Sequence, residues 1–494
     1  MKKIIALLLA VMMLVTLVAC TKAPADTTTK APVSGNDATE GKTDNTEAGS
    51  DEKEIVTVKW VTTNDQPGNY ESWVNTVNAY AADKIGVNVE MVHVDQETMR
   101  LMVQTGADWD IVFAPGGEFT MCIEYGAAAP LEVLMVNVPG LTDLIPQYVF
   151  DAVTVDGHLY GIPAYKDVSH SEYFIWDKEM VDTYYPEYTE VHDLKGAYEA
   201  LKTMKERGCP WLGWQTSSSF NFNGALTWNY DTCEIGAPVG INFNGGTEFV
   251  SIWEQPDVLE NLSYAEKLYH EGYVNNDSYI VDSVMGNEFV LGQGWGWPSA
   301  KLTAWPRDGR PVEVSQYYYT TVSTGSCRGS ILVLNKASTK LVEALKWIEL
   351  VNTDTWVRDM YWHGEEGVQW EYTEVDGVKK IQKIETDVSW TYWAYMYGTF
   401  FTATEEVNGT PWGEIKTLNE SAVASPAMGF TFDKTPVADQ IAAVSAAWEP
   451  YVSMVEYGVD ISQLDLALED MYACGLQDII DEANRQYQDW LASK

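Results

Sequence analysis

The stretch Asp110-Ile-Val-Phe-Ala-Pro-Gly-Gly-Glu118 places a short apolar strand directly before two glycines and the start of a helix. Upstream, the same order occurs twice: a strand over 55–62 precedes an amphipathic helix around 73–81, and a strand over 87–94 precedes a helix over 97–104. Strands that alternate with helices predict a parallel sheet with right-handed crossovers. Because ligands bind at the carboxyl ends of such strands, the loops after 62 and after 114 are candidate ligand loops.

A second α/β unit follows along the chain. Asp156-Gly157 is a hairpin turn signal, and so is Asp376-Gly377. Between them we expect a strand over 170–176, helices over 193–207, 256–271 and 339–352, and a strand that ends in Gly292-Gln-Gly-Trp-Gly-Trp-Pro298. The tail over 437–491 is predicted to be helical, in segments separated by Pro450 and Gly475.

Composition excludes several classes of protein. The chain has 494 residues, 46% of them hydrophobic, which is enough to build cores in two or three domains. Its 72 acidic residues outnumber 31 basic ones, giving a formal net charge of −41. This balance argues against nucleic acid and against electrostatic docking on anionic lipid, since both need clustered Lys and Arg. The 20 tryptophans call for a role beyond core filling.

The N-terminus is typical of export. Lys2 and Lys3 precede an apolar stretch over 4–18 that is too short for a spanning helix and ends in Leu17-Val-Ala-Cys20. This ending resembles the lipobox of bacterial lipoproteins, which implies a signal peptide over 1–19 and lipidation of Cys20. Residues 20–54 are polar and lack aromatic residues, so we expect a disordered tether. The five remaining cysteines are widely spaced; buried free thiols are favoured over one disulfide between Cys209 and Cys233.

Several stretches together resemble the extracellular solute-binding lipoproteins of ABC importers, in particular the carbohydrate-type family 1. They are Lys59-Trp-Val-Thr-Thr-Asn-Asp65, Gly106-Ala-Asp-Trp-Asp-Ile-Val-Phe-Ala114, Asp156-Gly-His-Leu-Tyr-Gly-Ile-Pro163, Ala344-Leu-Lys-Trp-Ile-Glu-Leu-Val351 and Gly364-Glu-Glu-Gly-Val-Gln-Trp370. Phe430-Thr-Phe-Asp-Lys-Thr-Pro-Val437, followed by a helix and by Gln486 and Trp490-Leu491, resembles the DUF3502-type tail of one subfamily.

The resemblance implies a periplasmic-binding-protein-like fold of type II, with two α/β lobes, a hinge and a helical C-terminal region. We expect an N-terminal lobe over 55–163, a C-terminal lobe over 164–315, a return to the first lobe over 316–352, and completion of the second lobe over 353–494. Crossings between the lobes are placed near 163–165, 305–316 and 352–356. The implied function is capture of a solute, expected to be an oligosaccharide, at the extracellular face of the bacterial membrane, and delivery to ABC permease subunits, without a cofactor.

Saccharides pack their C–H faces on aromatic rings and hydrogen-bond to planar amides and carboxylates. Trp295 and Trp297 stand among glycines, and Trp228 lies near Asn221 and Asn223, so these five residues are candidate ligand contacts; core packing is the alternative for each tryptophan.

The remaining candidates come from the strand ends and the crossing. Asn64 and Asp65 contact the ligand or else cap a helix or turn. Glu118 is a ligand carboxylate or only a first-turn residue that favours the helix dipole. Tyr165 lies at the expected crossing and either faces the cleft or is a plain surface residue, and Glu366 has a role at the ligand or the hinge.

Catalytic patterns are missing from the sequence: it contains no HExxH, GxSxG or P-loop, and Glu365-Glu366 are adjacent rather than opposed across a substrate. No metal site is indicated. A surface glycan-active enzyme and a sensory or adhesive glycan receptor of the same fold remain the alternative functions.

Overall fold

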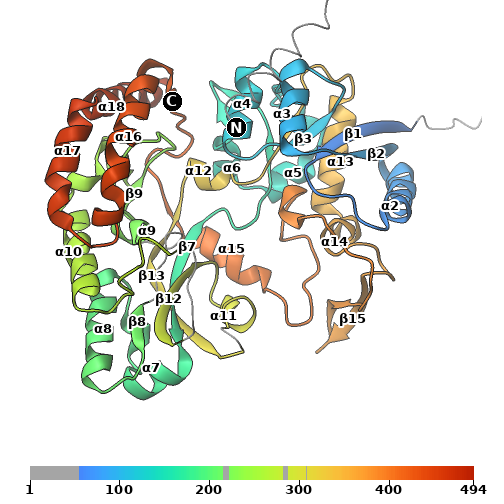
Figure 1. Cartoon of the computed structure of the whole chain (residues 1–494). Coiled ribbons are helices and arrows are strands. Elements are labelled where there is room, and N and C mark those ends of the chain that lie inside the picture. The colour runs from blue at the N-terminus through green and yellow to red at the C-terminus, as the bar shows by residue number, and fades with distance from the viewer. Residues whose placement is uncertain (1–54, 215–221, 282–287, 307–308) are drawn as a thin grey trace, which may run out of the picture. The chain divides into compact units, whose positions relative to one another are not determined.

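The computed structural model describes residues 55–214, 222–281, 288–306 and 309–494. They belong to one compact unit, Lys53–Lys494, which contains two five-stranded sheets, each with its own hydrophobic core (Figure 1). We call the parts around these sheets the first and second lobes. The predicted signal peptide, Cys20, the tether and Asn221 lie outside the described residues.

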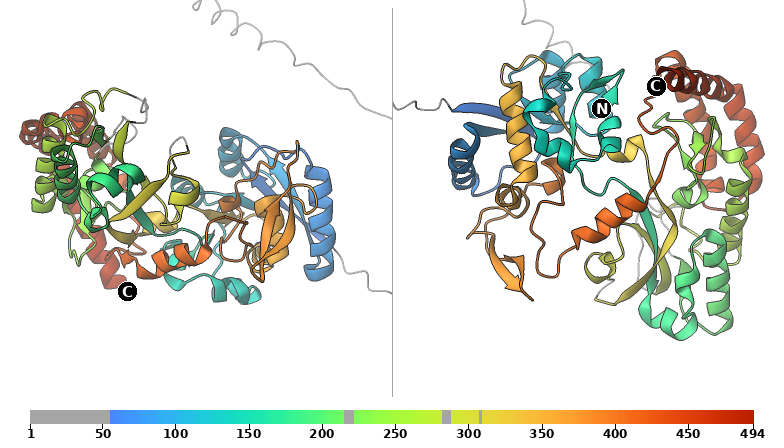
Figure 2. Two further views of the ribbon diagram at one scale, coloured as in Figure 1. Left: turned by 90° about the horizontal axis from the view of Figure 1, so that it is seen from below. Right: turned by 180° about the vertical axis from the view of Figure 1, so that it is seen from behind.

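The first sheet has the order β2-β1-β3-β14-β6, and β1 is parallel to both β2 and β3, as predicted. Its strands are β1 (Val56–Thr62), β2 (Val87–His93), β3 (Ile111–Phe113), β6 (Ile162–Pro163) and β14 (Ile331–Leu334). Its helices are α2 (Tyr70–Ile85), α3 (Gln96–Thr105), α4 (Gly117–Glu124), α5 (Pro139–Leu144), α6 (Gln147–Asp151), α13 (Leu341–Thr353) and α14 (Thr355–His363). Helix α13, in light orange, packs against β1 and β2 (Figure 2).

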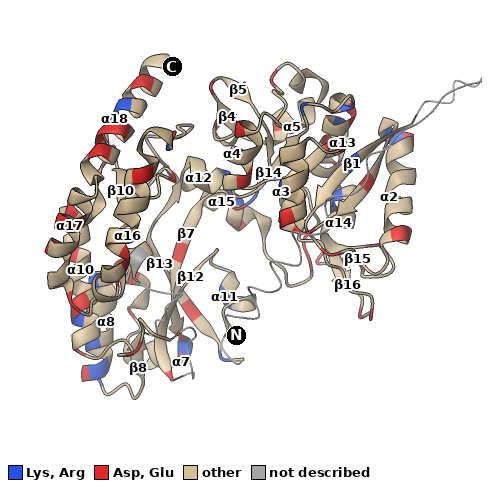
Figure 3. Cartoon of the chain, turned by 45° about the horizontal axis from the view of Figure 1, so that its top comes forward, with Lys and Arg blue, Asp and Glu red and all other residues tan. Residues whose placement is uncertain are grey.

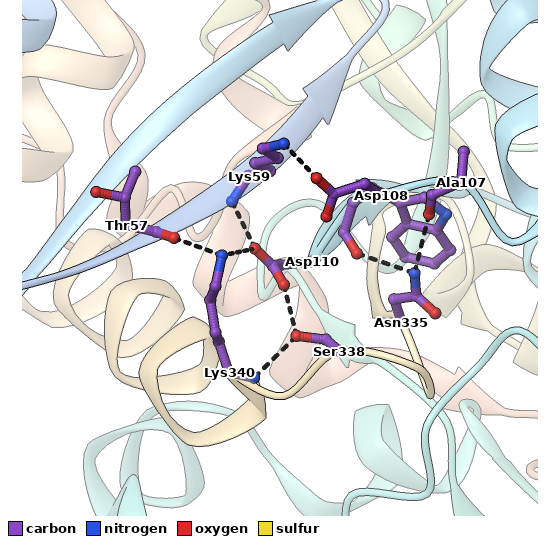
Figure 4. Close-up of polar contacts among 9 residues, drawn as sticks. Thr57, Lys59, Ala107, Asp108, Asp110, Asn335, Ser338 and Lys340 are labelled. Atoms are coloured by element: carbon purple, nitrogen blue, oxygen red, sulfur yellow. Dashed lines mark hydrogen bonds and ion pairs between the residues drawn. The ribbon is translucent and has the colours of Figure 1, made fainter. Parts of the chain in front are cut away.

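A polar network fixes the amino edge of this sheet (Figure 4). The buried Asp110 carboxylate accepts hydrogen bonds from the Lys59 backbone N at 2.8 Å and from the Ser338 Oγ at 2.5 Å, and it pairs with the Lys340 Nζ at 3.4 Å. Asn335 donates to the Trp109 carbonyl at 2.9 Å. The network ties β1, β3, the end of β14 and the start of α13 together, on the side opposite the predicted ligand loops.

The second sheet has the order β17-β13-β7-β12-β8. Its strands are β7 (His170–Asp177), β8 (Leu212–Trp214), β12 (Phe289–Trp295), β13 (Val312–Val322) and β17 (Val423–Ala424). A small sheet is formed by β9 (Tyr230–Asp231), β10 (Val239–Asn242) and β11 (Val250–Ser251), and two hairpins by β4 (Thr154–Val155) with β5 (His158–Leu159) and by β15 (Trp370–Val375) with β16 (Val378–Lys383). The remaining helices are α7 (Lys178–Tyr184), α8 (Leu194–Glu206), α9 (Asn223–Leu226), α10 (Pro256–His270), α11 (Ala300–Thr303), α12 (Thr324–Cys327), α15 (Trp412–Ser421), α16 (Ala438–Val455), α17 (Leu464–Ala473) and α18 (Leu476–Ser493).

The C-terminal helices cover the second lobe beside α10 (Figure 1). Trp448 of α16 stacks on Trp253 with ring centroids 4.8 Å apart, and the imidazole of His270 donates to the Val459 carbonyl at 3.0 Å. Pro450 does not end a helix as predicted: α16 continues through it and ends at Val455. Packing of α16 on α17 and α18 outweighs the single hydrogen bond that the proline removes.

The structure corrects two predicted boundaries. β13 continues to Val322 within the second sheet, so the chain returns to the first sheet only over 323–330, not over 305–316. Residues 353–397 do not complete the second lobe either, because Tyr361, Trp370 and Tyr397 are buried in the core of the first sheet. The indole N of Trp73 donates to the Met360 carbonyl at 2.9 Å and so ties α14 to α2. The chain therefore crosses to β17 after residue 397, not at 352–356, and its first crossing lies between β6 and β7.

Acidic side chains are spread over the outer helices, including α10, α17 and α18 (Figure 3). Among the described residues, no helix is both apolar enough and long enough to span a bilayer. The cysteines at 122, 209, 233, 327 and 474 are free thiols, so Cys209 and Cys233 are not joined by a disulfide.

Candidate functional site

The loop after β1 supports another segment of the chain. Asn64 is 7% exposed; its Oδ1 accepts a hydrogen bond from the Trp393 backbone N at 2.5 Å, and its Nδ2 lies 2.6 Å from the Met396 Sδ. The carbonyl of Asp65, whose side chain is exposed, accepts from the Thr391 Oγ at 2.5 Å. The carboxyl end of the first strand therefore anchors residues 391–396.

These residues belong to the aromatic run Trp390-Thr-Tyr-Trp-Ala-Tyr-Met-Tyr397. The run forms one wall of a cavity of about 690 Å³, which we call the aromatic cavity. Its lining residues are Trp362, His363, Gln369, Lys383, Ile384, Trp390, Tyr392, Trp393, Ala394, Tyr395, Phe400 and Glu406. The Trp393 side chain is 62% exposed, and its ring lies 6.0 Å from that of Tyr395, tilted by 31°.

A buried guanidinium holds this wall in place. Arg358, on α14, is 0% exposed; its Nε donates to the Thr399 carbonyl at 2.6 Å, and its Nη2 donates to the carbonyls of Ala394 at 2.8 Å and Gly398 at 3.0 Å. The Asn352 Oδ1 accepts from the Thr399 backbone N at 2.8 Å. These hydrogen bonds fix the irregular backbone of residues 394–399 in one conformation.

Three polar side chains of the cavity lining, Glu406, Lys383 and His363, lie in contact with one another. The Glu406 carboxylate lies 2.9 Å from the Lys383 Nζ and 3.4 Å from the His363 Nδ1. Burial alone would raise the pKa of Glu406, but the hydrogen bonds from His363 and Lys383 outweigh it and lower the pKa below its ordinary value, so this group is an anion at neutral pH. The Gln369 amide is engaged with Asn69 and with the Glu365 backbone N.

A second aromatic cluster lies at the ends of β7 and β12, in the second lobe. The His170 ring lies 5.0 Å from that of Trp228 and 5.9 Å from that of Trp295. Trp295 is 53% exposed, whereas Trp228 is buried and its Nε1 donates to the Tyr319 carbonyl at 2.9 Å. Trp297 is half-buried, and its indole N has no hydrogen-bond partner among the described residues. The structure thus brings Trp228 and Trp295 together and exposes only Trp295.

The other predicted contacts have protein partners. Glu118 pairs with Arg100 of α3 and accepts from the Gln96 amide at 2.8 Å. Burial would raise the pKa of Glu118, but these contacts outweigh it and lower the pKa. Tyr165 is buried; its ring packs on Phe401 and its carbonyl accepts from the Thr399 Oγ at 2.6 Å.

Glu366 is exposed and accepts from the Trp356 Nε1 at 2.8 Å, whereas the neighbouring Glu365 is buried against Asn69 and Ser72. The two carboxylates therefore face different partners. Asn223 begins α9, but its side chain lies outside the described part of the chain.

None of the predicted residues that the structure describes lines the aromatic cavity; Asn64 supports it from behind. The signal that could have found the cavity is the density of rings in 390–397, where five of eight residues are aromatic. Among the described residues there is no group of three or more His, Cys, Asp or Glu side chains placed to hold a metal ion.

Two sheets with separate cores, joined by several crossings, define the fold of a two-lobed binding protein. The model of the family described as "Bacterial extracellular solute-binding protein" matches residues 75–363, more than half of the chain, so the protein belongs to this family. A domain of unknown function, DUF3502, matches residues 426–492, which confirms the predicted tail.

Relatives and solved structures agree with this assignment. A carbohydrate ABC transporter substrate-binding protein from Streptococcus pneumoniae serotype 4 is 21% identical over 477 residues, which cover 92% of this chain and 94% of the relative. The crystal structure of an N-glycan transport solute binding protein (NgtS) from Streptococcus pneumoniae superposes with a TM-score of 0.76 at 18% identity and covers 88% of this chain and 99% of the other. An HMO-binding, ABC-transporter-associated solute binding protein from Bifidobacterium longum infantis gives a TM-score of 0.57 at 13% identity, over 89% and 99% of the two chains. The predicted fold class is confirmed.

Proposed function

We propose that this protein captures an oligosaccharide outside the cell and delivers it to the permease subunits of an ABC importer, without chemistry of its own. The observation that carries the proposal is the aromatic cavity. Six of its lining residues are Trp, Tyr or Phe, and a volume of about 690 Å³ suits several sugar rings. Aromatic faces receive the C–H faces of sugars, and the Glu406 carboxylate is an acceptor for their hydroxyl groups.

Two further features support the proposal. The relative named above is a carbohydrate transporter subunit, and one structure of the pneumococcal protein is a complex with Man1GlcNAc, at a TM-score of 0.66 to this chain. Trp295 is the exposed ring of the second aromatic cluster, on the second sheet. We assign it a contact with the ligand in the closed state, in which the two lobes enclose the ligand. In this proposal Asn64, Tyr165 and Trp228 are supports rather than ligand contacts.

Attachment to the outer face of the membrane belongs to the same proposal. The diacylglyceryl group on Cys20 carries two acyl chains, which anchor a protein stably, where one chain alone is marginal. The experiment is metabolic labelling with a palmitate analogue in cells that express the full chain or Cys20→Ser. Label and membrane association should both disappear in the variant; a labelled Cys20→Ser chain would contradict the anchor.

Calorimetric titration of the full chain with Man1GlcNAc, Man5GlcNAc and kestose tests the binding function. At least one of these glycans should bind saturably and raise the melting temperature. Trp393→Ala should reduce that rise, and Tyr125→Ala is the matched control because Tyr125 is similarly exposed, at 57% against 62%, and does not line the cavity. Hydrolysis of a glycan by the purified chain, or absence of binding to all three, would overturn the proposal.

A further inference from the structure

The charges of the aromatic cavity cancel within its wall. Lys383 and Glu406 are the lysine and the carboxylate among the lining residues, and they form an ion pair with Nζ and Oε2 2.9 Å apart. The second oxygen of Glu406 lies 3.4 Å from the His363 Nδ1, and the His363 Nε2 donates to the Thr404 carbonyl at 3.2 Å. A ligand in the cavity therefore meets a cation that already has an anionic partner.

The cations around the cavity are compensated in the same way. Lys380, on the same strand as Lys383, pairs with Glu405 at 2.5 Å. Arg358 lies behind the Trp362 ring, is 0% exposed, and is followed in the chain by the equally buried Asp359. Lys380 and Lys383 are thus each paired with a carboxylate, and the Arg358 guanidinium is buried with its donors on backbone carbonyls.

The pairing of Lys383 with Glu406 determines whether a charged ligand gains electrostatic binding energy in the cavity. A ligand carboxylate or sulfate that reached the Lys383 ammonium would lie only a few ångströms from the Glu406 carboxylate, so attraction and repulsion would nearly cancel. The anion would still lose its hydration against the aromatic wall. A chain with a net charge of −41 also repels anions as they approach, within the screening length of about 8–10 Å in physiological salt.

We propose that the aromatic cavity selects uncharged glycans over acidic ones, and that Glu406 is the residue that sets this selectivity. The inference rests on the proposed function. A neutral glycan uses Glu406 as an acceptor for its hydroxyl groups, whereas an acidic sugar is refused by the same carboxylate. The class of ligand is therefore a neutral oligosaccharide without uronic acid, sialic acid or sulfate.

The test uses two ligands that differ in charge and hardly in size. The first ligand is the glycan, among Man1GlcNAc, Man5GlcNAc and kestose, that binds the full chain most tightly. The second ligand is the same glycan with one C6 hydroxymethyl group oxidised to a carboxylate. We expect the native chain to bind the neutral form at least tenfold more tightly than the oxidised form. Glu406→Gln keeps the shape of the wall and frees Lys383, so the affinity for the oxidised form should rise about tenfold and become dependent on salt.

Two other variants keep the test decisive. Lys383→Met leaves Glu406 without its cation and should widen the preference for the neutral form, so the two variants shift the ratio of affinities in opposite directions. Glu371→Gln removes an exposed carboxylate of β15 that does not line the cavity and should leave the ratio unchanged.

The outcomes separate the two proposals. Equal binding of both ligands to the native chain, or an unchanged ratio of affinities in a folded Glu406→Gln chain, overturns the selectivity and leaves the capture of glycans standing. Binding of neither ligand overturns the proposed function itself.

Discussion

Replacing Arg358 by Met tests whether one buried guanidinium holds the wall of the aromatic cavity. Its three hydrogen bonds to the carbonyls of residues 394, 398 and 399 have a charged donor, and each such bond contributes about 1.5–3 kcal/mol. Three of them amount to roughly 4–9 kcal/mol. Methionine does not bear the desolvation cost of a buried cation, which offsets several kcal/mol of this loss. We expect the free energy of unfolding to fall by about 3 kcal/mol, the balance of these opposing effects.

Methionine is the informative replacement because it fills a comparable volume and its sulfur packs well against an aromatic ring, here that of Trp362. The assay is urea unfolding followed by tryptophan fluorescence, with a glycan titration at low denaturant. Affinity should fall at least tenfold, since the loop that carries Trp393 loses its pre-organisation. Arg485→Met is the control: Arg485 is an exposed cation of α18 paired with Glu482 and Asp489, and its loss should leave the free energy of unfolding almost unchanged. An Arg358→Met chain as stable as the native one, with unchanged affinity, would refute the reasoning.

Three further predictions follow from the same geometry. Trp393→Ala should weaken glycan binding by about 2 kcal/mol, roughly 30-fold in calorimetry, with almost no change in melting temperature because the side chain is 62% exposed. Trp228→Ala should instead cost about 3–5 kcal/mol of stability in chemical denaturation, since this indole is buried; lost affinity at full stability would contradict its supporting role. The pKa of Glu406 is lowered on folding, so its contribution to stability is present above the ordinary value of 4.5 and is lost as the pH falls through the lower value of the folded state; Glu406→Gln should flatten the acid limb of a plot of stability against pH.

Local patterns were sufficient for β1, β2 and β3 of the first sheet. The apolar strands over 55–62 and 87–94 correspond to β1 and β2, because alternation and β-branched residues encode a strand without reference to the rest of the chain. The two predicted hairpins form as well, with positive φ at Asp156 (51°) and Gly157 (79°), as the turn requires.

Assignment of segments to lobes failed where packing is long-range. The sequence of α14 does not say which sheet covers its buried side chains. The contact that decides this is made by Trp73, which lies nearly 300 residues away in the chain. The prediction that Pro450 separates two helices was wrong for a related reason. Packing of α16 on neighbouring helices stabilises the helix in spite of the proline inside it.

The candidate site was only half predictable. Asn64 was correctly placed at the edge of the sheet, but its amide is occupied by Trp393 and Met396, which no sequence pattern reveals. Trp295 and Trp297 were predicted as ligand contacts because they stand among glycines. The aromatic cavity instead arises where α14, the β15–β16 hairpin and residues 390–406 meet. A cavity made by segments that are separated in sequence has no local signature other than its composition.

The polar network around Asp110 has a consequence for how such proteins diversify. It fastens the first sheet at the amino ends of its strands, while Asn64 and the aromatic run lie at the carboxyl ends. Substitutions of exposed residues at the carboxyl edge therefore leave the hydrogen bonds of the amino edge intact. Exchange of an exposed side chain of the aromatic run, such as Trp393, would change the surface that a ligand meets and leave the Asp110 network and the buried rings Tyr392 and Tyr397 in place, and an engineer who grafts a new specificity has the same freedom.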